Sequence, residues 1–128
     1  MFFIRFLLGL NTLFELTTAV ILLVKPTFFF NDIGGASEAS AALSSMARNF
    51  AFGAIGIATL SGLMMMTRPL TREVRYAGYG ALMAFHLGMT IAQLVNVIQG
   101  LTTVLAIAVH GGFLLVFLSL FLWTAMRE

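Results

Sequence analysis

The chain has 128 residues, of which 60% are hydrophobic and only 9% are charged, and its formal net charge is +2. A soluble domain normally carries about 25% charged residues, so this composition excludes a conventional water-soluble fold and predicts that lipid is the main solvent. The few basic residues are scattered, which argues against a nucleic-acid surface, and the lack of cysteine excludes disulfides, iron–sulfur clusters and thiolate-bound zinc.

The first predicted membrane span covers residues 3–24, which is long enough to cross about 30 Å of hydrocarbon. Arg5 followed by an apolar stretch resembles the start of a signal peptide, but Glu15 lies in mid-run and no cleavage pattern of small residues follows. We therefore predict an uncleaved helix. It should end at Lys25-Pro26, because proline cannot continue a helix.

The second predicted span covers residues 43–66 and follows a loop. Three phenylalanines, Phe28–Phe30, would lie in the interfacial zone of that loop, and Ser37 is a suitable N-cap for the next helix. Within the span, small residues recur at every fourth position and would let another backbone approach closely. These are Ala54, Ala58 and Gly62.

The third and fourth predicted spans form a hairpin. Residues 76–126 contain no Lys, Arg, Asp or Glu, and such a run is about twice what one membrane-spanning helix needs. We predict spans at 76–98 and 102–125, with a turn near Gln99-Gly100 and a polar turn at 67–75 before them. The third span carries a stripe of small residues that predicts a helix-packing surface. The stripe consists of Gly80, Ala84, Gly88 and Ala92.

Four spans place both termini on one side of the membrane. That side receives five arginines, and the other receives Lys25 and at most one arginine. The five are Arg5, Arg68, Arg72, Arg75 and Arg127. The positive-inside rule then predicts cytoplasmic termini. The predicted fold is an all-α, integral membrane four-helix bundle of up-down topology, with residues 1–128 forming a single domain.

Three ionisable side chains fall at similar depth in three different spans. Glu15 lies about 12 residues, or about 18 Å, from the cytoplasmic end of the first span. His86 lies about 11 residues from the same side of the third span, and His110 lies about 9 residues from the outer side of the fourth. An ionisable group inside a span costs a few kcal/mol, so we expect all three to face the bundle interior.

Helical phase predicts a polar seam along the inner faces of the spans. Asn11 shares a face with Glu15, and Gln93 shares one with His86. Arg48 is interpreted as a snorkelling arginine or as the partner of Glu15. The predicted residues of a buried relay or pairing set are Glu15, Arg48, His86, His110 and Gln93.

Two kinds of chemistry remain open for His86 and His110. Histidines on different helices at matched depth can bind a haem axially, a chlorophyll-type magnesium, or a metal ion together with Glu15. The simpler interpretation, which we favour, is hydrogen bonding between helices. We keep both as cofactor-binding candidates for an unidentified cofactor, such as haem, a chlorophyll-type pigment or a quinone. No metal site and no catalytic residue is assigned.

Two stretches carry a resemblance to a known family. The second span contains Ala47-Arg48-Asn49-Phe50-Ala51-Phe52-Gly53-Ala54 and runs on into Gly56 and Gly62, and the third contains Ala84-Phe85-His86-Leu87. With the short basic turn between them, the chain resembles small four-helix bacterial inner-membrane proteins of the DoxX-like kind. The resemblance implies a bacterial inner-membrane location, and it allows an association with quinone-linked redox complexes, which some of these proteins have.

These features favour a small, non-catalytic membrane subunit that packs through its glycine-containing stripe. Its partners would be lipids and a larger redox or energy-transducing complex, or copies of itself. One alternative is a haem-, quinone- or chlorophyll-binding protein that uses His86 and His110. Another is a small proton-coupled transporter or channel that uses Glu15, His86 and His110. Enzymatic activity stays open but is disfavoured, because the sequence has no phosphate loop, nucleophile elbow or HExxH motif.

Overall fold

The computed structural model describes residues 2–26, 28, 41–67, 69–99 and 104–126. These residues form the helices α1 (Phe2–Val24), α3 (Ala41–Met66), α4 (Arg72–Ile98) and α5 (Val104–Met126). Each of the four is long and apolar enough to cross a membrane, so the prediction of an all-α fold with four membrane-span-like helices is confirmed. The predicted cap at Ser37, Phe29, Phe30 and the turn residue Gly100 lie outside the described residues.

Helix α4 begins earlier than the predicted span. Thr71 caps it, because its side-chain oxygen accepts a hydrogen bond from the backbone N–H of Val74 at 3.3 Å, and Glu73 lies in the first turn, where a negative charge meets the positive helix end. The helix therefore includes Arg72 and Arg75, which the sequence placed in a polar turn. The apolar run marks the membrane-embedded part, while the cap determines where the helix starts.

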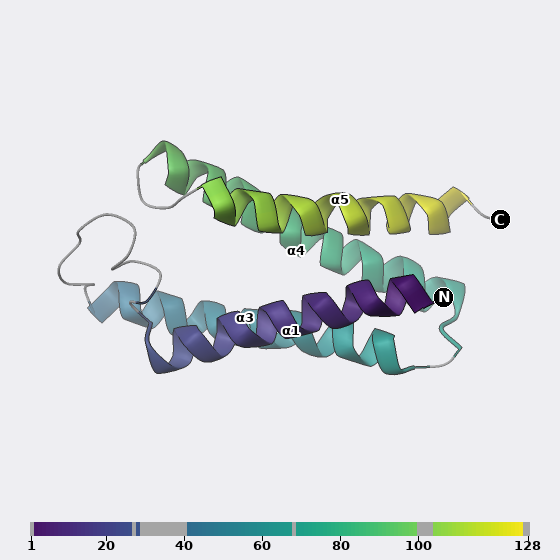
Figure 1. The fold of residues 1–128 in the computed structure, drawn as a ribbon, viewed down its shortest axis with the longest axis horizontal. Helices are drawn as coiled ribbons and strands as arrows, with labels where there is room; N and C mark the ends of the chain where they lie inside the picture. The colour runs from purple at the N-terminus through teal and green to yellow at the C-terminus, as the bar shows by residue number, and fades with distance from the viewer. Residues whose placement is uncertain (1, 27, 29–40, 68, 100–103, 127–128) are drawn as a thin grey trace.

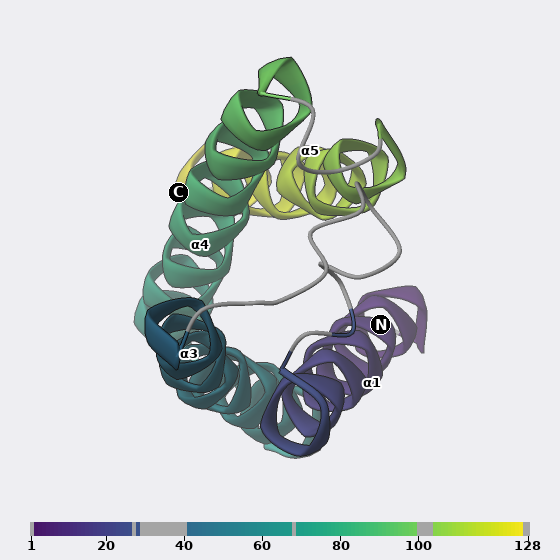
Figure 2. The same cartoon turned by 90° about the vertical axis from the view of Figure 1, so that its left-hand side faces the viewer.

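The four helices are arranged as two close pairs. Helix α1 packs along α3, and α4 packs along α5, while α3 and α4 meet over a smaller area (Figures 1 and 2). In the end-on view of Figure 2, the α1–α3 pair lies below the α4–α5 pair. Side chains that join the two pairs therefore determine how the halves of the bundle sit together.

Small residues allow the close approach of α3 to α1. Ala54 is fully buried and Ala58 nearly so, and a Cβ added to Gly62 would lie 3.6 Å from the side chain of Thr12 on α1. The predicted small-residue repeat of the second span thus packs inside the bundle.

A cluster of larger apolar side chains joins the two helix pairs. It contains Leu8, Met64, Tyr79, Leu82 and Phe117.

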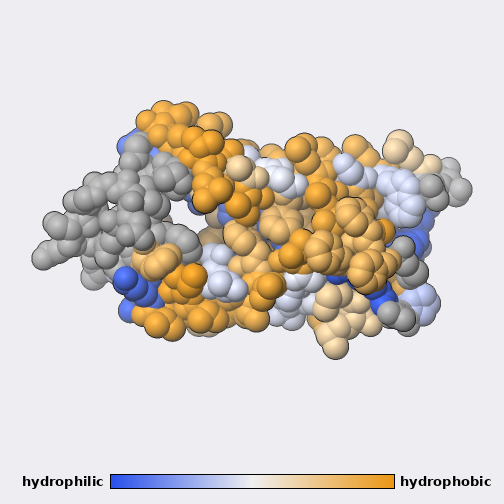
Figure 3. Space-filling view, viewed as in Figure 1, coloured by the Kyte–Doolittle hydropathy of each residue, from blue (hydrophilic) through white to orange (hydrophobic). Residues whose placement is uncertain are grey.

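The outside of the bundle is apolar and several polar side chains are inside. Phe3, Leu13, Leu105 and Leu115 are each more than 60% exposed, and apolar residues dominate the face in Figure 3. The buried polar side chains are Asn11, Glu15, Ser61, His86, His110 and Thr124. Large exposed apolar surfaces are unfavourable in water, whereas in lipid a polar group is best placed between helices. The distribution fits a lipid solvent.

Candidate functional site

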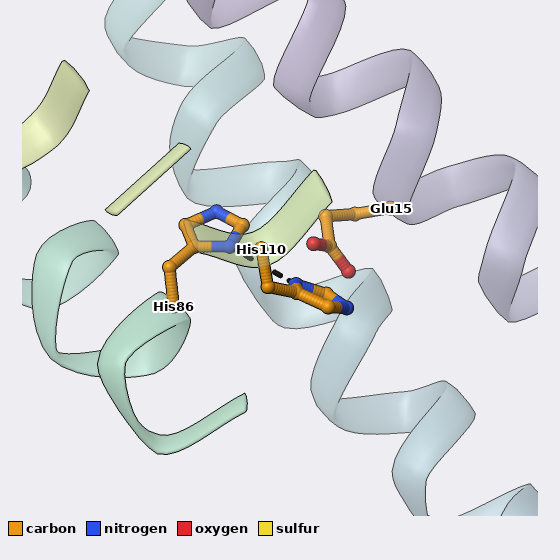
Figure 4. Close-up of side chains that lie close together, drawn as sticks. All are labelled: Glu15, His86 and His110. Atoms are coloured by element: carbon orange, nitrogen blue, oxygen red, sulfur yellow. Dashed lines mark hydrogen bonds between the residues drawn. The ribbon is translucent and has the colours of Figure 1, made fainter. Parts of the chain in front are cut away.

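Glu15, His86 and His110 meet in the core of the bundle, each from a different helix. Glu15 and His86 are fully buried, and His110 is 6% exposed. One potential metal-ligating atom from each side chain lies within 4.8 Å of the other two, and Figure 4 shows the three side chains turned toward one another. The three groups that the sequence predicts to face inward are therefore buried together in the structure. We call this set the Glu–His–His centre.

The two imidazole rings are directly hydrogen-bonded to each other. Nδ1 of His86 and Nδ1 of His110 are 3.2 Å apart, which is hydrogen-bonding distance, and the dashed line in Figure 4 marks this bond. It joins α4 to α5 within their pair.

A chain of hydrogen bonds continues from His86 across to the other pair of helices. Nε2 of His86 lies 2.8 Å from Oδ1 of Asn11 on α1. Nδ2 of Asn11 donates to Oγ of Ser61 on α3 at 3.2 Å, and Oγ of Ser61 donates to the backbone carbonyl of Leu8 at 3.1 Å. All four helices are thus connected by one buried polar chain.

The direction of this chain follows from its chemistry. A backbone carbonyl can only accept, and an amide nitrogen can only donate, so Asn11 must present its oxygen to His86. His86 therefore carries its proton on Nε2. With both rings neutral, Nδ1 of His86 holds a lone pair and Nδ1 of His110 donates the proton between the rings. The protein fixes the tautomer of His86 through Asn11.

Aromatic rings surround the two imidazoles. His86 stacks on Phe113 and Phe117, with ring centroids 5.1 and 5.6 Å away. Phe14 meets the ring of His110 edge-on at 5.6 Å, and Phe85 contacts both imidazoles. These walls lower the local dielectric, which strengthens polar interactions made inside them.

Glu15 is the one member of the centre that has no hydrogen-bonding partner within the described part of the chain. Both of its carboxyl oxygens are buried and unbonded, although Figure 4 shows the carboxyl group directed toward the ring of His110. Buried polar groups are nearly always paired, and an exception calls for an explanation such as a functional role or a missing ion. The centre therefore has an unused acceptor group.

The other predicted site residues lie outside this chain of hydrogen bonds. Arg48 is exposed on α3 and Gln93 is half-buried on α4, and across the described ranges no hydrogen bond joins either to the centre. Of the small-residue stripe of α4, only Gly80 packs within the chain, since a Cβ there would lie 3.2 Å from Phe121. The remaining stripe residues are exposed. They are Ala84, Gly88 and Ala92.

Sequence reasoning left out Ser61 and did not place Asn11 in the site. Asn11 had a usable signal, because it lies one helical turn before Glu15 on the same face. Ser61 had a weaker one, since it lies seven residues after the buried Ala54 and so shares its face.

The arrangement can bind a cation or share a proton. It offers two imidazole nitrogens and a free carboxyl group within an enclosed core. A separate apolar groove of about 290 Å³ lies between α1 and α5, lined by residues that include Phe3, Leu7, Leu115 and Leu120, and none of its lining residues belongs to the centre.

Comparison with known proteins found no family model, curated protein or solved structure that matches the chain.

Proposed function

We propose that this chain is a small, non-catalytic membrane subunit that holds a ligand at its Glu–His–His centre. The observation that carries the proposal is the buried Glu15 carboxyl group, whose two oxygens have no partner among the described side chains. A purely structural network gains nothing from an unpaired acceptor, because each buried unpaired group costs about 1–3 kcal/mol. A binding site gains an interaction there when its ligand arrives.

The ligand must tolerate the contacts that the histidines already make. Both ring nitrogens of His86 face polar partners, namely His110 and Asn11. An axial bond from His86 to a haem iron or a chlorophyll magnesium would replace one of them. A small ligand that enters between the rings and Glu15 also replaces the bond to His110, but it keeps the bond to Asn11. It leaves Phe113 and Phe117 stacked on His86, whereas a large flat ring would have to displace them.

The test is to purify the full-length chain from its native membrane in mild detergent and to identify what it carries. Mass spectrometry, elemental analysis and an absorption spectrum together cover small ions, quinones and tetrapyrroles. The proposal predicts a stoichiometric ligand that is lost from the Glu15→Gln variant. A protein that carries nothing and binds nothing added would contradict it.

A second proposal concerns assembly, and the exposed part of the α4 stripe supports it. A Cβ added to Gly88 would meet no atom within 4 Å in the part of the chain that the structure describes, and Ala84 and Ala92 are exposed beside it. Small residues on a lipid-facing helix allow close helix–helix packing, so this face suits another membrane subunit or a second copy. Crosslinking in intact membranes tests it. Recovery of the chain only as a monomer would contradict it.

The proposal includes the location and the orientation of the chain. We place it in a bacterial inner membrane as a DoxX-like, up-down bundle with cytoplasmic termini. A hydrogen bond of 3.3 Å from the Arg72 side chain to the carbonyl of Ala125 ties the start of α4 to the end of α5, and Figure 1 places the start of α1 at that same end. This arrangement supports the proposed orientation, in which the positive-inside rule assigns the arginine-rich helix ends to the cytoplasmic side. Reporter fusions at both termini would test this orientation.

A further inference from the structure

We propose that the ligand of the Glu–His–His centre is a transition-metal ion of the Zn²⁺ or Fe²⁺ type, bound by Glu15 and by Nδ1 of both His86 and His110. This inference rests on the proposed ligand-binding function and specifies its chemistry. Four features support it: the spacing of the nitrogens, the outer-shell bond to His86, the Glu15 carboxyl group without a partner among the described residues, and the donor set.

The spacing of the two nitrogens suits a shared metal ion. Two imidazole nitrogens that each lie about 2.0–2.1 Å from a tetrahedral metal are about 3.3–3.4 Å apart. Nδ1 of His86 and Nδ1 of His110 are 3.2 Å apart. The separation of the two nitrogens therefore needs little change when a metal ion takes the place of the proton. Both rings must turn, however, because the proton lies on the line between the nitrogens and a tetrahedral metal ion lies beside that line.

The outer shell of His86 is already that of a metal ligand. A metal-bound histidine usually donates its other ring N–H to a carbonyl or carboxylate oxygen, which fixes its tautomer and orientation. Here Nε2 of His86 donates to Oδ1 of Asn11 at 2.8 Å, and Asn11 is held by Ser61. The lone pair of His86 Nδ1 is thereby fixed toward His110.

Glu15 supplies the third ligand. Its carboxyl oxygens are buried and have no partner in the described residues, and the group is directed into the centre (Figure 4). Binding the ion would give these oxygens the interaction that they lack. One carboxylate with two imidazoles leaves a position open for a further ligand, and an anion there would balance the remaining positive charge, which is costly to leave in hydrocarbon.

The donor set selects the class of metal. Two imidazoles and one carboxylate suit zinc or iron(II), whereas magnesium and calcium prefer sites built from oxygen atoms alone. The sequence has no cysteine, so thiolate cannot take part. When the metal binds, the proton between the rings must move to Nε2 of His110 or leave the protein, because a nitrogen that binds a metal cannot also carry a proton.

The experiment is a titration of the full-length, metal-stripped protein in mild detergent with Co²⁺, whose visible absorption reports its coordination geometry, followed by competition with Zn²⁺. The proposal predicts one Co²⁺ per chain with a four-coordinate spectrum, displaced by Zn²⁺. Glu15→Gln should weaken binding by more than about 100-fold, which is the upper end of what losing an outer-shell partner costs.

The matched control is Glu73→Gln, the same substitution at an exposed position of α4, about 20 Å along the helix from His86. It should bind Co²⁺ as the parent chain does. Circular dichroism and size-exclusion chromatography of the metal-free proteins check that each variant folds, and His110→Gln replaces Glu15→Gln in the comparison if that variant does not.

Equal Co²⁺ affinity in the Glu15→Gln and Glu73→Gln variants would overturn the metal proposal, as would the absence of any Co²⁺ or Zn²⁺ binding. If the native protein instead carries an organic molecule that Glu15→Gln loses, the metal proposal fails while the ligand-binding function stands. If the native protein carries neither a metal nor an organic ligand and the stripped protein binds no added Co²⁺ or Zn²⁺, both proposals fail.

Discussion

The two sides of α4 differ in what covers them. On the inner side, Tyr79, Leu82 and His86 are at most 1% exposed, and His86 bonds to two other helices. On the outer side, Ala84 and Gly88 are exposed, and no atom of the described residues lies within 4 Å of where a Cβ on Gly88 would be. One helix thus carries one face that assembles this bundle and another that the bundle leaves uncovered.

This difference shows which pattern determines the fold. The polar side chains of the inner faces link both helix pairs through directed hydrogen bonds, so they specify how the pairs meet. The outer face of α4 has no such role within the chain. Substitutions on the two sides should therefore separate stability from association.

His86→Phe should destabilise the bundle most. Phenylalanine fills the space between Phe113 and Phe117 but loses the bonds to Asn11 and His110. An interhelical hydrogen bond in a membrane is worth up to about 1.7 kcal/mol, so losing both should cost about 2–3 kcal/mol. Unfolding of the detergent-solubilised protein by SDS, followed by circular dichroism, measures this cost. Unchanged stability would mean that the polar chain does not hold the pairs together.

Two glycines of α4 provide a matched comparison of its two sides. A Cβ on Gly78 would overlap the side chain of Met64, whereas one on Gly88 would meet open space. Gly78→Leu should therefore cost about 1–3 kcal/mol through overpacking. Gly88→Leu should leave the stability of the monomer unchanged but reduce crosslinking to a neighbour in the membrane. Equal losses of stability in the two variants would contradict the assignment of inner and outer faces.

Glu15→Leu should stabilise the ligand-free protein. Leucine removes a buried carboxyl group that has no partner among the described residues, and its loss should raise the free energy of unfolding by about 1–2 kcal/mol. The same variant should bind no Co²⁺. A stability gain combined with loss of binding would identify Glu15 as a residue kept for function. A loss of stability would instead show that Glu15 supports the fold.

Thr90→Val should have the smallest effect. The Thr90 hydroxyl donates to the backbone carbonyl of His86 in its own helix at 2.7 Å, so it joins no two helices. Its loss should change stability by less than about 0.5 kcal/mol. The same SDS titration applies, and an effect as large as that of His86→Phe would mean that hydroxyls bonded within one helix also stabilise the bundle.

The four membrane-span-like helices followed from the sequence for simple reasons. Long apolar runs identify membrane spans, and the fixed rise per residue gives the depth of Glu15, His86 and His110 within them. Helical phase then indicates which side of each span is polar. Depth and helical phase together predict that these three side chains lie close to one another in the bundle interior.

The sequence did not show which neighbouring helix, if any, packs against each helix face. The small-residue repeats of the second and third spans look alike, yet the one containing Ala54 and Ala58 packs inside the bundle and the one containing Gly88 is largely exposed. Periodicity identifies a face but not what covers it, because the rotation of one helix relative to the next depends on side-chain packing. For the same reason Ser61 was missed and Arg48 was considered as a partner of Glu15.

The most direct test of this account is a measurement of the imidazole nitrogens by NMR. The chain has only two histidines, so ¹⁵N-histidine labelling gives an uncrowded spectrum of the metal-free protein in detergent. The account predicts a scalar coupling between the two Nδ1 atoms through the proton that His110 donates, with the single proton of His86 on Nε2. Two uncoupled rings, or a His86 that carries its proton on Nδ1, would contradict the buried Glu–His–His centre on which the proposed function rests.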